Sequence, residues 1–365
     1  MTNTKGKRRL RPLLWINYLF VILLLLTNVS PVLSPDLFWP IALFSLAFPF
    51  IVLINFLFFI YWLAVFKRYL FYSLLAMILS YSLILDHLQI RTSVTQTEEN
   101  QISLLSFNVH NLSNTNINRG DKVIRNSILQ FVDEQNADII CFQEFQSYPT
   151  RGVHTVNDFQ KKLGHAYVHQ FPYLQKNTHE FVDLMLVYSR FPIVDFQDFY
   201  MDGKTYGCYV DIDIEGKIHR LFNLHLESNH FDRNDYEIFS EKDVNLNEKK
   251  RNQILLLLQK IKKYSSKRAL QARKIRSEIE ISPYPVIVAG DLNDVPASFA
   301  FHHIKSNLKD AFREKGKGYS NTYNGNLPPM RIDYILVDPK IAILDYQVLE
   351  PDLSDHFPII INFKP

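Results

Sequence analysis

Charge is almost absent from one long region of the sequence. Between Leu13 and Leu85 the charged residues are Asp36, Lys67 and Arg68 alone. This composition excludes an ordinary soluble domain there, because a membrane-spanning helix needs about 20 consecutive, mostly apolar residues. We therefore expect residues 1–91 to form a membrane domain. The expected spans are a bundle of three transmembrane helices at about 13–32, 37–66 and 69–85.

Cysteine is equally scarce, with Cys141 and Cys208 the only two. Each lies in an apolar or alternating run, which predicts a small buried side chain and requires no disulfide.

A cleavable signal peptide is not favoured by the sequence. No small-residue cleavage site follows the basic start of the chain, and two further apolar runs come after the first.

Lysine and arginine predict how the chain is oriented, because they are enriched in cytoplasmic segments. None lies in the turn after the first span, whereas Lys67 and Arg68 follow the second. The first eleven residues carry Lys5, Lys7, Arg8, Arg9 and Arg11. We therefore expect a cytoplasmic N-terminus in an inner or cell membrane, with the chain bound to the membrane lipids through the three helices. Everything after Leu85 would then lie outside the cytoplasm.

The remainder of the chain lacks an excess of basic residues. Residues 1–95 hold eight Lys and Arg and two Asp and Glu, so 32 basic and 35 acidic residues remain, a net charge of −3. This excludes a generally basic nucleic-acid-binding domain. Residues 92–101 are polar and aperiodic and read as a linker, so residues 102–365 are expected to form one soluble domain.

Strand-like runs and helix-like runs alternate through this soluble domain. The pattern predicts an α/β sandwich with two sheets inside and helices outside. The expected strands are 101–109, 137–145, 181–189, 284–294, 331–338 and 358–363, with a hairpin at 208–226. The expected helices are 122–135 and 247–279, the second with a candidate break near Ser265 and Ser266.

Polar side chains occur at or near the ends of six of these strands. Each one alone is explained by a turn, a cap or a satisfied buried group. Together they supply oxygen and imidazole groups at one edge of a sheet, and Mg²⁺ prefers oxygen ligands. The residues are Asn108, Glu144, His225, Asp291, Asn293, Asp333 beside Arg331, Asp355 and His356.

Seven short motifs follow one another in this domain: FNVHN, QE, SRFPI, NLHL, GDLND, RIDYIL and SDHFP. From Ile102 to the C-terminus the chain resembles the endonuclease/exonuclease/phosphatase superfamily. That superfamily includes deoxyribonucleases, abasic-site endonucleases, neutral sphingomyelinases and inositol-polyphosphate 5-phosphatases. The resemblance implies a four-layer α/β/β/α sandwich and hydrolysis of a phosphoester by a water that Mg²⁺ or Mn²⁺ activates.

The resemblance also implies roles for the polar residues. Glu144 corresponds to the main metal-ligating carboxylate, with Asn108 and Asp355 near the metal. Asp291 corresponds to the residue that aligns or deprotonates the water. Asn293 would hold Asp291 and a phosphate oxygen in place.

Four further residues match the superfamily's motifs. His356 would contact the phosphate or move a proton, and Asp333 would orient it. His225 and Arg190 match a histidine and an arginine of the deoxyribonuclease and sphingomyelinase branches. A carboxylate partner raises the pKa of a histidine and fixes its tautomer, which suits Asp333 to its place.

The substrate is left open at this stage. We expect a phosphodiesterase or phosphatase acting on nucleic acid, phospholipid or a small phosphoester. The alternatives are a nuclease for DNA or RNA outside the cytoplasm and a catalytically inactive, membrane-bound binding protein. No protein partner is predicted. The segments with which the abasic-site branch grips DNA are not found, and the extensions typical of 5-phosphatases do not match.

One stretch, from Lys249 to Arg276, has eleven Lys and Arg and neither Asp nor Glu. It fits the solvated face of an amphipathic helix, a contact with a nucleic-acid backbone, or adhesion to anionic lipid headgroups. If the stretch contacts a polyanion or an anionic membrane, Lys262, Lys263, Lys267 and Arg268 would act together there, away from the metal motifs.

Overall fold

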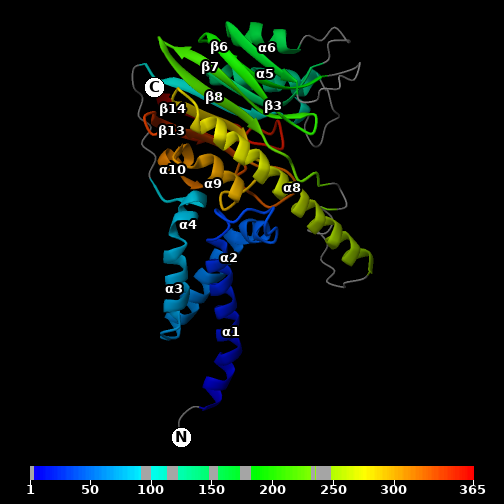
Figure 1. The fold of residues 1–365 in the computed structure, drawn as a ribbon. Coiled ribbons are helices and arrows are strands. Elements are labelled where there is room, and N and C mark those ends of the chain that lie inside the picture. Colours follow the sequence, from blue (N-terminus) through cyan, green and yellow to red (C-terminus); the bar gives the residue numbers. More distant parts are fainter. Residues whose placement is uncertain are drawn as a thin grey trace.

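The computed structural model describes residues 4–91, 100–112, 122–147, 155–172, 182–231, 235 and 248–365. A layered domain lies above a group of N-terminal helices, and the chain begins at the end of those helices that is farthest from the domain (Figure 1).

One sheet of the domain has six strands, among them the first and the last strand of the layered domain. Its central strands β2 and β3 run parallel, and β2 pairs on its other side with the antiparallel β14. Across the sheet the strands are β13 (Ala342–Val348), β14 (Ile359–Lys364), β2 (Ile102–Asn108), β3 (Ile139–Ser147), β5 (Val182–Ser189) and β4 (Tyr167–Pro172).

The second sheet also has six strands. Its parallel pair is β8 and β9, and the hairpin expected around Glu215 and Gly216 is formed by β7 and β8. Across the sheet the strands are β10 (Lys309–Asp310), β12 (Asp333–Val337), β9 (Val286–Asp291), β8 (Lys217–His225), β7 (Lys204–Ile214) and β6 (Ile193–Met201).

The two sheets face each other across an apolar core, and helices cover their outer faces. Core residues from both sheets meet in one cluster, which includes Leu104, Val187, Val210 and Ile335. The helices α5 (Lys122–Gln135) and α6 (Thr155–Leu163) pack on the first sheet. The helices α8 (Glu248–Glu280) and α9 (Phe299–Lys305) pack on the second, and α10 (Ala311–Lys315) packs at the edge of the core. The predicted four-layer α/β/β/α sandwich is confirmed.

The N-terminal helices differ in part from the expected three spans. They are α1 (Thr4–Thr27), α2 (Ile41–Ala64), α3 (Leu70–Leu79) and α4 (Tyr81–His87). Among the described residues α2 is the one helix long and apolar enough to cross a membrane, and α3 with α4 makes a second candidate although the pair is bent by 69°. The apolar part of α1, Arg11–Thr27, is shorter than a full span. A count of three spans is therefore not confirmed.

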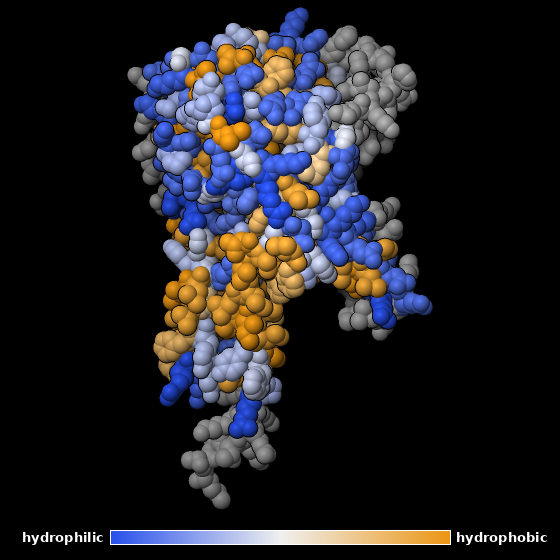
Figure 2. Space-filling model, viewed as in Figure 1, coloured by the Kyte–Doolittle hydropathy of each residue, from blue (hydrophilic) through white to orange (hydrophobic). Residues whose placement is uncertain are grey.

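The surface of these helices is strongly apolar, with many large side chains exposed (Figure 2). Polar groups are instead turned inward, where they bond to one another. Asn17 is the centre of one such set: its Nδ2 donates to Ser73 Oγ at 2.7 Å, and its Oδ1 accepts from Trp62 Nε1 at 2.9 Å. A group with polar contacts inside and apolar side chains outside suits a lipid environment.

The helices dock on the layered domain through their upper ends. Ser30, in the turn between α1 and α2, donates from Oγ to the Ala297 carbonyl at 2.6 Å. At the end of α4, the Asp86 carbonyl accepts from Arg331 Nη2 at 2.8 Å. Directly after α4, β1 (Leu88–Gln89) pairs with β11 (Gly318–Tyr319). The turn between α2 and α3 therefore lies at the far end, on the same side as the N-terminus (Figure 1).

Two details of the predicted elements can be settled here. The candidate break in the long basic helix is absent, because α8 runs unbroken through Ser265 and Ser266. Their hydroxyls bond to the Lys262 and Pro35 carbonyls without interrupting the helix. Cys141 and Cys208 are both buried and free, as expected.

Candidate active site

The polar strand ends meet at one edge of the sandwich. In the parallel pairs β2–β3 and β8–β9 the carboxyl ends point the same way, so Asn108, His225 and Asp291 end their strands at this edge. The antiparallel strand β12 begins there with Asp333, and His356 lies shortly before β14. Strand direction thus gathers residues that are up to 248 positions apart, from Asn108 to His356.

The backbone is unusual at several of these positions. Glu144 has a φ of 51°, and the pairing of β3 with β5 shifts its register there, between Phe142 and Phe145. Such a bulge turns a side chain out of the regular alternation of a strand. Asn293 also has a φ of 51°. Non-glycine residues in this region carry strain that is often found at functional sites.

Gly290 has a different role in the same edge. Its φ is 131°, and an added Cβ would lie 2.1 Å from the Leu224 carbonyl oxygen. Only glycine allows β9 to approach β8 this closely. The side chain that follows, Asp291, is thereby brought to the end of β8 and its His225.

Asn108 joins the two sheets at the site. Its Nδ2 donates to Glu144 Oε1 at 3.3 Å in its own sheet and to Asp291 Oδ2 at 3.1 Å in the other. The Nε2 of His225 lies 3.3 Å from Glu144 Oε1 and 3.8 Å from Asp291 Oδ2. Two carboxylates, an amide and an imidazole are therefore in mutual contact.

Below this contact, a buried amide pair fixes the distance between the sheets. Asn223 donates from Nδ2 to the carbonyls of Phe142 and Leu186, both at 3.1 Å. Its Oδ1 accepts from Gln143 Nε2 at 2.7 Å. These side chains support Glu144 and His225 from beneath. Asn223 stands in the NLHL motif, but its supporting role was not predicted.

His110 is a second residue that the sequence reasoning missed. Its Nδ1 lies 3.1 Å from Asp355 Oδ1 and 3.8 Å from Glu144 Oε2, and its backbone N–H donates to Asn108 Oδ1 at 3.1 Å. Burial alone would lower the pKa of His110, but Asp355 and Glu144 raise it above its usual value. Its place in FNVHN, two residues after Asn108, was the available signal.

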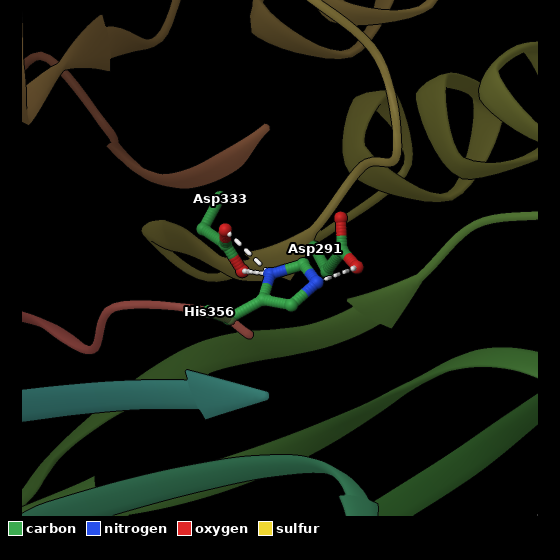
Figure 3. A group of neighbouring side chains, drawn as sticks. All are labelled: Asp291, Asp333 and His356. Carbon is green, nitrogen blue, oxygen red and sulfur yellow. Dashed lines mark hydrogen bonds and ion pairs between the residues drawn. The ribbon is translucent and has the colours of Figure 1, made fainter. Parts of the chain in front are cut away.

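His356 lies between two aspartates (Figure 3). Its Nδ1 is 2.9 Å from Asp333 Oδ2, and its Nε2 is 3.8 Å from Asp291 Oδ2. Burial opposes a charge on this imidazole, yet Asp333 and Asp291 outweigh burial and raise the pKa of His356 well above its usual value. Because a carboxylate occupies Nδ1, Nε2 is the atom turned toward the rest of the site.

The carboxylates of the site fall into two classes. Burial would raise the pKa of Glu144, but its hydrogen bond with His225 and the neighbouring histidines lower it to about 2. The pKa of Asp355 is lowered as well, because His110 outweighs burial. The pKa of Asp291 is raised to about 6 by burial, which His356 offsets only in part. Carboxylates with pKa values pushed apart in one site suit different tasks.

These shifts indicate where a cation fits. Glu144 and Asp355 stay charged, and both approach Nδ1 of His110, so negative charge is concentrated at this point of the site. Asn108 adds an amide oxygen beside them. Such oxygen donors are what Mg²⁺ and Mn²⁺ prefer. One oxygen or nitrogen each of Asp291, Asp333 and His356 also lie within 4.8 Å of one another. In that group, however, the imidazole already bridges the two aspartates.

The structure brings together eight of the nine predicted site residues, and Arg190 is the exception. Arg190 follows β5, whose end lies at the start of the antiparallel β3. There its Nη1 donates to Asp138 Oδ1 at 2.9 Å and its Nη2 to Asn136 Oδ1 at 2.5 Å. This is the opposite edge of the sheet from Glu144. The expectation that Arg190 shares the site is wrong.

The expected contact of Asn293 with Asp291 is made by a different group of Asn293, and one further expectation needs correction. The side chain of Asn293 donates to the Leu226 carbonyl at 2.9 Å, and it is the backbone N–H of Asn293 that holds Asp291 Oδ1, at 2.7 Å. The four basic residues Lys262, Lys263, Lys267 and Arg268 do not all lie away from the metal motifs. Arg268 is buried and donates from Nε to Asp294 Oδ2 at 2.9 Å, one residue beyond Asn293.

Comparison with known proteins agrees with this geometry. The model of the endonuclease/exonuclease/phosphatase family matches residues 105–356. A second model, a domain of unknown function (DUF8431), matches residues 9–87. The comparison with curated proteins gives no match.

Solved structures share the fold at low identity. D. rerio TDP2, complexed with single-strand DNA product, is 17% identical with a TM-score of 0.51, covering 73% of this chain and 100% of that one. The human Nocturnin catalytic domain, with bound sulfate, is 16% identical with a TM-score of 0.51, covering 75% and 97%. A family protein from Bacteroides thetaiotaomicron is 18% identical with a TM-score of 0.50, covering 73% and 96%.

The family match spans the edge at which Asn108, Glu144, Asp291, Asp333 and His356 converge. The chain therefore belongs to the endonuclease/exonuclease/phosphatase family, and it is a phosphoric ester hydrolase.

Proposed function

We propose that this protein is a membrane-anchored, divalent-metal-dependent phosphoester hydrolase whose active site is the polar edge of the sandwich. The proposal is supported above all by the different pKa values of the carboxylates in the site. Glu144 and Asp355 have lowered pKa values, whereas Asp291 has a pKa of about 6. Charged carboxylates hold a cation, and a carboxylate with a pKa near neutrality accepts and returns a proton.

Glu144 and Asp355, with the amide of Asn108, would hold Mg²⁺ or Mn²⁺. When bound, the ion supplies a Lewis acid that polarises a phosphoryl oxygen and acidifies water. His110 approaches both carboxylates and carries a raised pKa, so it balances their charge.

Asp291 is placed to orient the attacking water and take its proton. Its Oδ1 is held by the Asn293 backbone N–H and its Oδ2 by Asn108, so the carboxylate has a fixed direction. His356 would donate from Nε2 to a phosphoryl oxygen, because Asp333 holds its other nitrogen. His225 would add a second donor. A phosphoryl transition state spreads negative charge over its oxygens, and such donors stabilise that charge.

The N-terminal helices would anchor this site to a membrane. The apolar α2 and the bent pair of α3 and α4 are the candidate spans. Lys67, Arg68 and the basic N-terminus lie at the end of the helices that points away from the catalytic domain. Positive residues favour the cytoplasmic side. In this arrangement the catalytic domain works outside the cytoplasm, and residues 1–91 form the membrane domain.

The substrate is proposed at the level of a class: a phosphodiester or phosphomonoester in nucleic acid, phospholipid or a small molecule. The DNA product bound to D. rerio TDP2 belongs to that protein, and it supports the inclusion of single-stranded DNA in any test of this one. The soluble part of the chain carries a net charge of −3, which does not favour nucleic acid in general.

The test is a substrate panel with the full-length protein in lipid nanodiscs. Bis-p-nitrophenyl phosphate reports general phosphodiesterase activity. DNA, RNA, sphingomyelin, phosphatidylinositol and inositol phosphates report the class, each with and without EDTA. We expect turnover that EDTA abolishes and Mg²⁺ or Mn²⁺ restores. A folded, metal-treated protein that hydrolyses none of them would overturn the proposal and favour a binding role.

A further inference from the structure

The first half of α8 presents an exposed face that mixes apolar and basic side chains. The helix extends past the layered domain, and its start lies at the level of the turn between α1 and α2 (Figure 1). On this face Leu255 and Leu256 are 48% and 56% exposed, and Arg251, Lys262 and Lys263 are exposed beside them. Figure 2 shows apolar and strongly hydrophilic atoms side by side at this end of the helix.

The same face continues into a contact with the membrane helices. Steps of three or four residues along a helix return to one side, and they lead from Lys262 and Lys263 to Ser266 and on to Arg273. Ser266 Oγ donates to the Pro35 carbonyl at 3.3 Å. Arg273 Nη2 lies 2.8 Å from Asp36 Oδ1. One side of α8 therefore already touches the turn between α1 and α2.

That turn also carries exposed apolar side chains. Their position indicates where the surface of the bilayer would lie. They are Val29, Val32, Leu37 and Phe38. α8 touches this turn at Ser266, in the middle of the helix, and again at Arg273. From there its first half runs obliquely past the layered domain, down to the level of the turn (Figure 1). The exposed leucines of α8 are then at the depth where headgroups meet acyl chains.

The charges on this face are available for a partner. Among the residues that the structure describes, Arg251, Lys262 and Lys263 form no ion pair. Lys267, by contrast, bonds to Glu227 at 2.7 Å, and Arg268 bonds to Asp294. A purely solvated face does not explain two adjacent exposed leucines, and a nucleic-acid contact does not explain them either. Leucines flanked by cations fit an anionic membrane surface.

We propose that the first half of α8 lies on the surface of the anchoring membrane, with Leu255 and Leu256 among the headgroups and Arg251, Lys262 and Lys263 against anionic lipid phosphates. This rests on the membrane anchoring in the proposed function. The other half of α8 carries Arg268, which donates to Asp294 Oδ2 and to the Glu227 carbonyl. These residues flank Asn293 and His225, so the contact holds the active site at a fixed height above the lipids.

The test places an environment-sensitive fluorophore at Leu256→Cys in the full-length protein. Cys141 and Cys208 are buried and burial raises the pKa of both thiols, so the introduced cysteine is the reactive one. The matched control is Val194→Cys, an exposed apolar position (54%) on β6, a strand far from the N-terminal helices (Figure 1).

In nanodiscs with about 30% phosphatidylglycerol, the probe at 256 should emit to the blue of the probe at 194. Lipids that carry a quencher near the headgroup should quench the probe at 256 and spare the probe at 194. The difference should shrink in pure phosphatidylcholine and at about 1 M salt, where the Debye length is about 3 Å. Changing Arg251, Lys262 and Lys263 together to glutamine should shrink it similarly.

Equal spectra and equal quenching at the two positions in anionic nanodiscs would overturn the contact and leave a solvated helix face. The readout does not depend on catalysis, so failure of the hydrolase activity leaves it unaffected. A protein that does not enter bilayers at all, judged by flotation after an alkaline wash, would overturn both this contact and the anchoring. An inserted protein with equal spectra would overturn the α8 contact alone.

Discussion

Replacing Glu144 by glutamine tests the proposed metal site most directly. The variant keeps the size of the side chain and an oxygen at the position that accepts from Asn108 Nδ2, 3.3 Å away. It removes the negative charge that faces His225 at 3.3 Å and His110 at 3.8 Å. Any loss of function can then be ascribed to charge, because the packing of the site is preserved.

The expected magnitude follows from the small number of charges at the site. Glu144 and Asp355 are the two carboxylates with lowered pKa values near His110, so the variant removes half of that negative charge. Loss of one electrostatic contact in an active site typically costs about 10²- to 10³-fold in kcat. We expect kcat/KM to fall by about 10²-fold or more, which corresponds to about 2.7 kcal/mol. Metal affinity should fall about 10- to 100-fold or further.

The assay is steady-state hydrolysis of bis-p-nitrophenyl phosphate over a range of Mg²⁺ concentrations, with Mn²⁺ binding measured by calorimetry. The control is Glu215→Gln, an exposed carboxylate in the turn before β8, at the end of that strand opposite His225. The control should behave as the parent. Excess Mg²⁺ should restore the Glu144 variant only in part. Near-parental kinetics at ordinary Mg²⁺ would refute the assignment of Glu144 as a metal ligand.

Three further substitutions distinguish residues that support the fold from residues of the candidate active site. Arg190→Gln should leave kcat/KM within about twofold and cost at most about 1 kcal/mol of stability in a urea titration, since its ion pair is partly exposed; a hundredfold loss of activity would return Arg190 to the site. Gly290→Ala should cost on the order of 3 kcal/mol or prevent folding, because its Cβ meets a β8 carbonyl at 2.1 Å; an unchanged urea midpoint would contradict the close approach. Burial would raise the pKa of Glu227, but His230 and Lys267 lower it from 4.5 to about 2. The charged Glu227 side chain therefore stabilises the fold above pH 4.5, and this stabilisation is lost as the pH falls toward 2. Glu227→Gln should therefore unfold with a weaker acid dependence in that window, and an unchanged slope would argue against the ion pair.

The layered fold could be predicted because its elements are encoded locally. The strands 101–109 and 284–294 are short apolar runs that end in polar residues, and the hairpin 208–226 has its turn at Glu215 and Gly216. The structure has β2, β9 and the β7–β8 hairpin at these places. The helix α6 and the strands β4 and β13 were not predicted. They are short, and their burial depends on the sheet they join.

The types of residue in the candidate site could be predicted from the sequence. Which individual residues belong to it was predicted less well. Asn108, Asp291 and His356 end or precede strands that the pattern already identified. Arg190 fails because the sequence does not show that β5 runs antiparallel to β3, which sends the two strand ends to opposite edges. His110 was overlooked although it lies in the FNVHN motif, because a single histidine after a strand end has no distinctive pattern of its own. Its role depends on Asp355, which is distant in the chain.

The N-terminal helices show the same limit. The run from 69 to 85 predicts one continuous span, yet the chain bends by 69° between α3 and α4, at Ser80. Neither proline nor glycine occurs there. The Oγ of Ser80 accepts from Asn28 Nδ2 at 2.8 Å, so a contact with the end of α1 accompanies the bend. Interactions between helices are not visible in hydropathy.

The layered domain and the N-terminal helices are joined beside the candidate active site. The loop that follows Asp291 reaches Ala297, which packs in one apolar cluster with Leu24, Phe48 and other residues of the N-terminal helices. The Ala297 carbonyl also accepts the Ser30 hydroxyl. The segment that positions the proposed general base is therefore packed directly against the proposed anchor.

A second connection reaches the other aspartate. Arg331 is buried and binds Asp310 with both terminal nitrogens, at 2.9 and 2.7 Å, while one of them also donates to the Asp86 carbonyl at the end of α4. Two residues later, Asp333 holds His356. Both aspartates that flank His356, the proposed catalytic histidine, thus lie within a few residues of a contact with the N-terminal helices. A flexible linker alone would keep the layered domain near the N-terminal helices without fixing its orientation. These buried contacts instead fix the orientation of the candidate active site relative to those helices.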